Sequence, residues 1–505
     1  MKSMALPLLM IFAVVWPTPT AQPEHRRFAI GVEYMTPGMA ETYARAGVTW
    51  AKSTAIRWGE VEPEPPKNGR HTYRWAEADR LILEYQRAGF RHFHVYLQCK
   101  NPWASSKPVK PIGGGSWLPK PEYMHDYRAF LTALVQRYNP QSPSHLAGLL
   151  YPVEYWEIES EWGTGFWQGT LEEYLQLLRV AYPTIKTANP NAKIILIGFF
   201  LAGVFENNPD PAQLPQIIRS LPQGRRAVSA RYLEDIRRLL DHPELFDVVE
   251  FHSLSDWSEI TGMTRFLKQT MRQRGYEKPI WVGDVNYTAS PMVFWGIPVP
   301  PYTNAQKPAI TATLKALSNP LHPRHAECMR WFRAEQSRGL VKKTVLAMAE
   351  GCAGINLGNM TDWGLFSLVS NIAGTVGFQG MIDASGKPLR PGAPRPAYQA
   401  LSLVVQKLGD YTAVRPLEVA RGLYAFQFTV RGRETVVAWY DDGRRYLPGD
   451  REPETTADLK LPAGRYTLVS TPIGPDTPDP RTVQAPDGTV RLRLGLTPVF
   501  LSRVQ

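Results

Sequence analysis

The chain has 505 residues, of which 44% are hydrophobic and 20% charged, and its formal net charge is +11. This length exceeds one ordinary domain and the composition excludes wholesale disorder, so we expect one large globular domain followed by a smaller one. The positive charge is spread along the sequence without a nucleic-acid-binding motif. It indicates a solvated basic exterior or an anionic substrate rather than a nucleic-acid partner.

Residues 1–21 have the pattern of a secretory signal peptide. Lys2 supplies the positive start, Ala5 to Trp16 form the apolar stretch, and Ala21 ends a polar segment with small residues. The apolar stretch is too short to span a bilayer, and no later segment reaches the roughly 18 apolar residues that a membrane helix needs. We therefore expect cleavage after Ala21 and a secreted or periplasmic protein without a membrane span.

Residues 22–411 alternate short β-branched or aromatic runs with longer amphipathic segments. The predicted strands are Phe28–Tyr34, Thr49–Ser53, His92–Leu97, Tyr155–Ser160, Lys193–Phe199, Phe246–His252, Pro279–Val285 and Gly354–Asn359. The predicted helices are Ala40–Ala46, Trp75–Ala88, Tyr127–Tyr138, Leu171–Thr187, Ala230–Leu240, Thr264–Arg274, His325–Ala349 and Ala397–Leu408. Eight such units predict an α/β fold of the (β/α)8 or TIM-barrel type. A doubly wound open sheet is the alternative, which the count of eight and the lack of a glycine-rich nucleotide turn disfavour.

Residues 412–505 follow a different pattern, with short strands and no helix between them. The predicted strands are Leu423–Val430, Thr435–Tyr440, Arg465–Ser470 and Val490–Leu494, separated by turns rich in Gly and Pro. This pattern predicts a small antiparallel, sandwich-like β-domain at the C-terminus. In the barrel, the long segments Lys100–Pro121 and Asn286–Pro323 follow strands, and such loops line the face on which barrel active sites lie.

Three cysteines, Cys99, Cys328 and Cys352, cannot all pair with one another. Their spacing matches no metal site, and neither HExxH nor CxxC occurs. Either one disulfide forms or the thiols are free and buried. We expect no metal and no cofactor, and we expect a monomer.

The segment Tyr155-Trp-Glu-Ile-Glu-Ser-Glu-Trp162 places Glu161 at the C-terminal tip of the fourth predicted strand. With Gly163-Thr-Gly-Phe-Trp167 behind it, this segment resembles the retaining glycoside hydrolases of clan A, family 39 in particular. Their strand-4 motif reads W-E-I-x-N-E-P, and the resemblance implies that Glu161 is the acid/base. Ser160 stands where Asn usually binds the sugar. The alternative is a surface acid at a helix start, favoured by the helix dipole.

Two further acids lie in the same segment, Glu157 and Glu159. If the strand runs straight, both share a face with Glu161, because side chains alternate along a strand. An inward-facing acid at Glu157 is expected to pair with a barrel Lys or Arg, and a structural role is favoured for each.

The seventh predicted strand reads Lys278-Pro-Ile-Trp-Val-Gly-Asp-Val-Asn-Tyr287. In the clan this pattern ends in Thr-Glu, and the Glu is the nucleophile, so the resemblance places Asp284 at the nucleophile position with Gly283 before it. Asp is shorter by one methylene, roughly 1.5 Å. Three outcomes are open: the backbone compensates and retention is kept, a water enters and the enzyme inverts, or sugar is bound without cleavage.

Other matches to the clan suggest substrate-binding residues around these two acids. Lys52 stands where a substrate-orienting Arg is common, and His252 ends the strand-6 pattern D-V-V-x-x-H, whose His lies near the nucleophile. Leu254 replaces the Tyr that normally hydrogen-bonds the nucleophile. The predicted substrate-binding residues are Lys52, Trp58, Trp103, Ser160, His252, Tyr287, Asn359 and Trp363. For each aromatic residue, ordinary packing is an equal alternative.

The sequence therefore supports two functions. The first is a secreted glycoside hydrolase that cleaves O-glycosidic bonds of a poly- or oligosaccharide, with Glu161 as acid/base and Asp284 as nucleophile or base. The second is a glycosidase-like protein that binds carbohydrate but has lost turnover, which Gly283, Asp284 and Ser160 favour. The sugar, the linkage and the choice between exo and endo action do not follow from the sequence.

Overall fold

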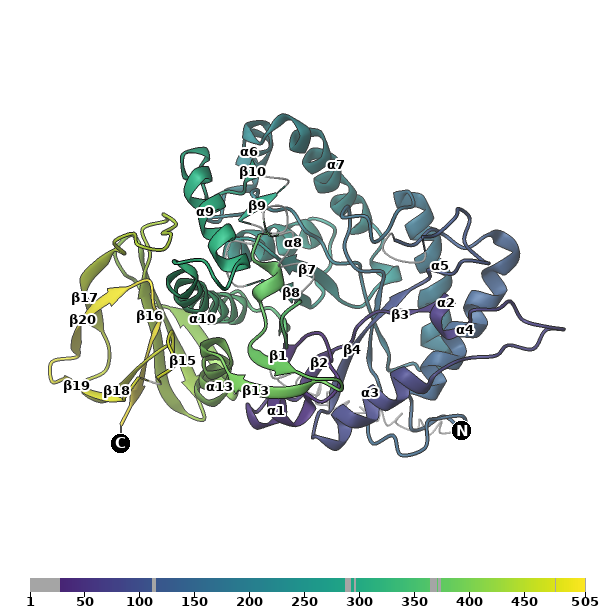
Figure 1. The fold of residues 1–505 in the computed structure, drawn as a ribbon, viewed down its shortest axis with the longest axis horizontal. Helices are drawn as coiled ribbons and strands as arrows, with labels where there is room; N and C mark the ends of the chain where they lie inside the picture. The colour runs from purple at the N-terminus through teal and green to yellow at the C-terminus, as the bar shows by residue number, and fades with distance from the viewer. Residues whose placement is uncertain are drawn as a thin grey trace, which may run out of the picture.

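A computed structural model of the chain describes residues 28–110, 115–286, 292–294, 297–363, 370, 374–476 and 478–504. The predicted signal peptide, residues 1–21, and Tyr287 lie outside these residues. The described part consists of a nearly closed barrel of parallel strands and a C-terminal antiparallel β-domain (Figure 1). This arrangement confirms the predicted fold class.

Eight parallel strands form the barrel, each overlapping one of the eight predicted strands. They are β1 (Ala29–Val32), β2 (Trp50–Lys52), β4 (His92–Gln98), β5 (Tyr155–Ile158), β6 (Lys193–Ile195), β7 (Val249–Ser253), β8 (Ile280–Val285) and β11 (Gly354–Leu357). Their hydrogen-bonded order is β6-β5-β4-β2-β1-β11-β8-β7, and the short β3 (Ile56–Arg57) also pairs with β4. Parallel bridges from Ile195 to Val248 and from Phe199 to Phe251 join β6 to β7, so the sheet closes on itself.

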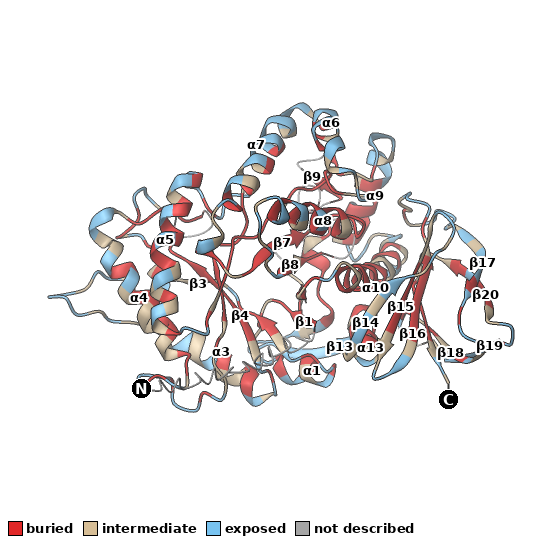
Figure 2. Cartoon of the chain, turned by 180° about the vertical axis from the view of Figure 1, so that it is seen from behind, coloured by how far each residue is buried: buried red, intermediate tan, exposed pale blue. Residues whose placement is uncertain are grey.

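Helices surround the barrel and turn their buried faces toward the strands (Figure 2). They are α1 (Ala40–Arg45), α2 (Trp58–Val61), α3 (Ala76–Arg87), α4 (Met124–Arg137), α5 (Leu171–Ala188), α6 (Leu214–Ser220), α7 (Gln223–Leu239), α8 (Glu259–Arg272), α9 (Lys307–Ser318), α10 (His325–Ala349) and α13 (Pro396–Leu408). Apolar side chains recur along one face of most of these helices, as the sequence pattern predicted. No helix of the described ranges is long and apolar enough to cross a membrane.

The C-terminal domain contains more strands than the sequence predicted. A six-stranded sheet has the order β14 (Tyr411–Pro416), β15 (Leu423–Val430), β16 (Arg433–Tyr440), β21 (Val499–Arg503), β18 (Gly464–Ser470) and β19 (Arg481–Ala485). A ribbon of β17 (Glu454–Lys460) and β20 (Thr489–Gly495) shares an apolar core with this sheet. The sequence missed β14, β17, β19 and β21. In β14 and β19 most side chains are exposed or half-buried, and in β17 polar residues predominate, so their apolar pattern is weak.

Helices α10 and α13 lie between the barrel and the C-terminal sheet (Figure 1). Most of α10 is buried because it is covered on more than one side, by α8 and β11 of the barrel, by α9 and α13, and by β14. Cys99, Cys328 and Cys352 are buried free thiols, which resolves the two sequence alternatives in favour of free cysteines.

Candidate active site

Glu161 lies at the C-terminal end of β5, as predicted, but the chain does not run straight to it. β5 ends at Ile158, and Glu159 adopts a left-handed backbone conformation with φ 62°. The strand therefore does not run straight, so the condition under which Glu159 would share a face with Glu161 is not met. Its carboxylate accepts the backbone N–H of Cys99 at 2.8 Å, and burial raises the pKa of Glu159 to about 7. Beyond this turn Glu161 is bridged to Gly198 and is 7% exposed.

Asp284 ends β8 on the same rim of the barrel. One of its carboxylate oxygens lies within 4.8 Å of a carboxylate oxygen of Glu161 and of a ring nitrogen of His252. Its Oδ2 accepts a hydrogen bond from the hydroxyl of Tyr34 at 3.0 Å. Leu254 stands where the family usually has a tyrosine that hydrogen-bonds the nucleophile. In this chain Tyr34, which follows β1, makes the hydrogen bond to Asp284 instead.

His252, at the end of β7, connects Glu161 to the barrel interior. Its Nδ1 lies 2.8 Å from Oε1 of Glu161, and its Nε2 lies 2.9 Å from Oε1 of Glu250. Burial alone would lower the pKa of His252, but the hydrogen bonds to the two carboxylates outweigh it and raise the pKa to about 10. An imidazolium that donates from both nitrogens therefore stands beside Glu161 at neutral pH.

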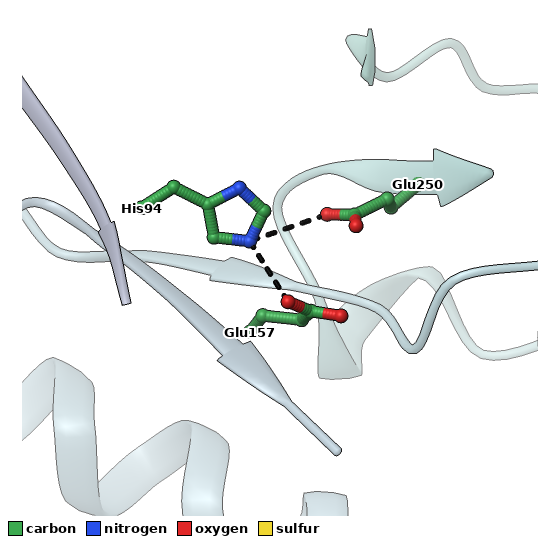
Figure 3. A group of neighbouring side chains, drawn as sticks. All are labelled: His94, Glu157 and Glu250. Atoms are coloured by element: carbon green, nitrogen blue, oxygen red, sulfur yellow. Dashed lines mark hydrogen bonds and ion pairs between the residues drawn. The ribbon is translucent and has the colours of Figure 1, made fainter. Parts of the chain in front are cut away.

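Beneath the rim, the barrel interior holds a buried network of charges instead of the usual branched apolar side chains. The ammonium of Lys52 lies 2.9 Å from Oε1 of Glu250 and 3.0 Å from Oε2 of Glu157. The Nε2 of His94 points between the same two acids, at 3.1 Å from Glu157 and 3.3 Å from Glu250 (Figure 3). The expected pairing of Glu157 with a barrel lysine is confirmed. Lys52, His94 and His252 outweigh burial and lower the pKa of Glu250 to about 2.

Gly283 is explained by this network. A Cβ atom at Gly283 would lie 1.7 Å from Oε1 of Glu250, far closer than van der Waals contact allows. The Thr that the family pattern carries would therefore displace Glu250 from Lys52 and His252. Lys52 also donates to the carbonyl of Gly283 at 3.2 Å, which fixes the backbone one residue before Asp284.

Of the predicted substrate-binding residues, two are fully buried. Lys52 is one of them, and it donates to the backbone carbonyl of Gly283, next to Asp284. Trp58 is also fully buried and donates its indole N–H to Glu62 at 2.8 Å, so it packs in the core. Trp103 is half-buried, lies edge-on to Trp58 and donates to the carbonyl of Glu62.

The other predicted residues lie near the rim. Ser160 precedes Glu161 and is 4% exposed. Trp363, beyond β11, is half-buried and stacks on the ring of Tyr34 at 5.6 Å between centroids. Asn359 belongs to the same segment and is 6% exposed. Tyr287 lies outside the described residues, so its predicted role stays a prediction.

Four residues of the site were missed by the sequence reasoning: Glu33, Tyr34, His94 and Glu250. Glu33 and Tyr34 directly follow β1, and polar residues at the end of a barrel strand were the available signal. His94 and Glu250 lie inside strands β4 and β7. Glu250 lies two residues before His252 on β7, so strand alternation could have placed it inward. His94 is the cross-strand partner of Lys52, a pairing that the sequence does not give.

Two groups of side chains have the composition of a metal site, namely His94 with Glu157 and Glu250, and Glu161 with His252 and Asp284. In the first group the ammonium of Lys52 lies between the two carboxylates, where it supplies the positive charge. In the second, Nδ1 of His252 is engaged with Glu161. In both groups, part of the candidate ligand set thus already makes ion pairs with neighbouring side chains.

The described residues form a (β/α)8 barrel with an appended β-domain, and the carboxyl groups of Glu161 and Asp284 meet at the rim of the barrel. No protein-family model and no curated protein sequence matches the chain. Among solved structures, a family 39 glycoside hydrolase from Bacteroides cellulosilyticus WH2 has a TM-score of 0.57 and 16% identity, covering 95% of this chain and 81% of that chain. A monomeric β-xylosidase from Caulobacter crescentus CB15 has a TM-score of 0.55 and 13% identity, with coverages of 95% and 97%.

A family 30 endoxylanase from Clostridium papyrosolvens C71 is also similar, with a TM-score of 0.50, 10% identity and coverages of 95% and 96%. The structural neighbours of this chain are thus family 39 and related clan A glycoside hydrolases. At these identities the similarity establishes the fold. It agrees with the resemblance that the strand-4, strand-6 and strand-7 motifs indicated.

Proposed function

We propose that the protein is a retaining glycoside hydrolase with Glu161 as acid/base and Asp284 as nucleophile. The observation that carries this proposal is the short separation of the two carboxyl groups, whose oxygens approach within 4.8 Å. Retaining enzymes hold their carboxyl groups about 5–5.5 Å apart, whereas inverting enzymes need about 6.5–9.5 Å to admit a water. This short separation supports retention despite the missing methylene of Asp284.

In the proposed first step, Asp284 attacks the anomeric carbon while Glu161 protonates the departing glycosidic oxygen. The hydroxyl of Tyr34 keeps Oδ2 of Asp284 in place. After proton transfer Glu161 is a carboxylate, which the N–H of His252 stabilises. In the second step Glu161 removes a proton from water, which attacks the glycosyl-enzyme ester and releases Asp284.

The proposed substrate is a poly- or oligosaccharide. Trp363 supports this choice because its half-buried ring stacks on Tyr34, directly beside Asp284, where it can face a sugar ring. The similar structures include β-xylosidases and an endoxylanase, so xylose-containing chains belong in the first panel of substrates. Carbohydrate binding without turnover is the second candidate, and Gly283, Asp284 and Ser160 are the departures that favour it.

Product stereochemistry tests the proposal. The mature protein is incubated with a panel of polysaccharides and aryl glycosides, and proton NMR follows the first anomer released. We expect the configuration of the substrate to be retained, because the carboxyl groups are too close for an intervening water. Release of the opposite anomer would contradict the nucleophile assignment. Binding of a glycan without any release, across the panel, would favour the second candidate.

We further propose that the protein is exported and acts as a monomer. The charge and apolarity of residues 1–21 support export, with Gln22 as the first residue of the mature chain. Intact-mass measurement of the protein recovered outside the cytoplasm is expected to show a chain that begins at Gln22, and sedimentation is expected to show one chain per particle. A full-length mass beginning at Met1 would contradict the export proposal.

A further inference from the structure

Glu33, the residue after β1, is a fully buried carboxyl group beside the proposed nucleophile. It is 0% exposed, and its Oε1 accepts the backbone N–H of Val285 at 3.2 Å. Its side chain packs against the backbone at Gly358, where an added Cβ would lie 2.9 Å from Cγ of Glu33. The carboxyl group is therefore fixed between β8 and the end of β11.

The carboxyl group of Glu33 adjoins Asp284: its Oε1 accepts the N–H of Val285, the residue after Asp284, and its buried Oε2 has no hydrogen-bond partner among the described residues. An ionised carboxylate has only acceptors, so two carboxyl groups can share a hydrogen bond only when one of them carries a proton. Among the residues that the structure describes, neither group forms an ion pair with a Lys, Arg or His. A proton on one of the two is then the way to avoid two adjacent buried negative charges.

The wider charge balance also calls for a proton at this place. Five carboxyl groups line the upper barrel interior: Glu33, Glu157, Glu161, Glu250 and Asp284. Lys52 is committed to Glu157 and Glu250, and His252 to Glu161 and Glu250. Within the described part of the chain, these two cations therefore make their direct ion pairs with carboxyl groups other than Glu33 and Asp284.

Burial decides which partner holds the proton. Asp284 is partly exposed and receives the Tyr34 hydroxyl, and both conditions favour its charged form. Glu33 is wholly removed from water. Burial first, and then the negative charge of Asp284, raise the pKa of Glu33 well above its usual value, while Lys52 on β2 acts weakly in the opposite direction. The adjacent Tyr34 is neutral, because burial and the surrounding carboxylates raise its pKa.

We propose that Glu33 is a positioning residue that stays a neutral carboxylic acid and donates a hydrogen bond to the carboxylate of Asp284. Together with Tyr34 it holds the shorter aspartate side chain in one orientation toward the sugar. The hydrogen bond itself is independent of catalysis, whereas its effect on the rate rests on the proposed function. No charge is created or lost in the pair: one proton is shared by two carboxyl groups.

The pH dependence of stability tests the protonation of Glu33 without requiring any activity. A carboxyl group whose pKa is raised on folding stabilises the fold below its unfolded pKa, near 4.5, and this contribution is lost as the pH rises through the folded value. Chemical denaturation of wild type and Glu33→Gln is measured between pH 5 and 9. We expect the unfolding constant of wild type to grow, relative to that of Glu33→Gln, by up to about tenfold per pH unit.

The test is how the ratio of the two unfolding constants changes with pH. A difference in stability that is the same at every pH reports only how the amide packs. A ratio that does not change with pH would overturn the proposal. If Glu33→Gln does not fold, Asp284→Asn provides the same readout. This substitution removes the negative charge next to Glu33 from a partly exposed position. Its free energy of unfolding should therefore rise relative to that of wild type as the pH increases. Parallel curves for Asp284→Asn and wild type would overturn the proposal as well.

Kinetics separate positioning from simple packing. In Glu33→Gln the amide N–H₂ can still donate to Asp284, whereas Glu33→Met has a similar volume and no donor. We expect kcat of Glu33→Gln to remain near wild type and kcat of Glu33→Met to fall at least tenfold, with KM nearly unchanged in both. Equal losses in the two variants would overturn the positioning role. If wild type cleaves nothing, the proposed function fails while the stability experiment still decides the state of Glu33.

Discussion

The substitution Glu161→Gln is expected to lower kcat for the natural glycan by about 10²–10⁴-fold, the usual contribution of a positioned acid or base. The amide keeps the size of the side chain and can still accept the N–H of His252, so glycan affinity measured by calorimetry should persist. Aryl glycosides with an acidic leaving group need little protonation, so their first step should be affected much less. Added azide should then restore turnover by replacing the water that Glu161 would activate.

Glu159→Gln is the matched control for this experiment. Glu159 lies two residues away on the same strand end and is also buried, but its carboxylate accepts the backbone N–H of Cys99. Its amide can still accept the same backbone N–H, so cleavage close to the wild-type rate is expected. A Glu161→Gln variant that cleaves the natural glycan as fast as wild type would remove Glu161 from the role of acid/base.

Lys52→Met is expected to reduce the free energy of unfolding by about 3–5 kcal/mol, the usual consequence of removing one partner of a buried ion pair. The ammonium of Lys52 is fully buried and lies about equally close to Glu157 and Glu250. Without it, two carboxylates remain in the barrel with only His94 and His252 beside them. Urea denaturation measured at neutral pH reports this loss.

The double variant Lys52→Met with Glu250→Gln tests why Lys52→Met is less stable. Glu250→Gln removes one of the two carboxylates that have lost Lys52, so it should recover part of the free energy of unfolding. The effects of the two substitutions should therefore not be additive. Arg491→Met is the surface control, because Arg491 and Asp458 form an ion pair that is largely exposed, and little change is expected. A Lys52→Met protein as stable as wild type, with additive behaviour in the double variant, would contradict the buried network.

The sequence determined the architecture because its signals are local. Each barrel strand has its own apolar run, and each major helix has its own amphipathic stretch, so neither required knowledge of distant residues. The two proposed catalytic acids were located in the same way. Glu161 and Asp284 stand at the ends of predicted strands, and in a barrel all such ends meet on one rim.

Only the tertiary structure decided what surrounds these acids, because the contacts join residues far apart in the chain. Tyr34 reaches Asp284 across 250 positions, and Lys52 reaches Glu250 across 198. The left-handed turn at Glu159 means that the strand does not run straight to Glu161, which strand alternation could not foresee. Trp58, which was a candidate to contact sugar, is fully buried in the core.

The sequence by itself thus determined a (β/α)8 barrel with a C-terminal β-domain and named Glu161 and Asp284 as its paired acids. The tertiary structure decided that carboxyl oxygens of these acids lie within 4.8 Å, that Tyr34 hydrogen-bonds Asp284, and that Gly283 makes room for Glu250. The physical reason is that a strand's pattern fixes which residues reach the rim. The distance between them depends on barrel closure and on buried charges contributed by other strands.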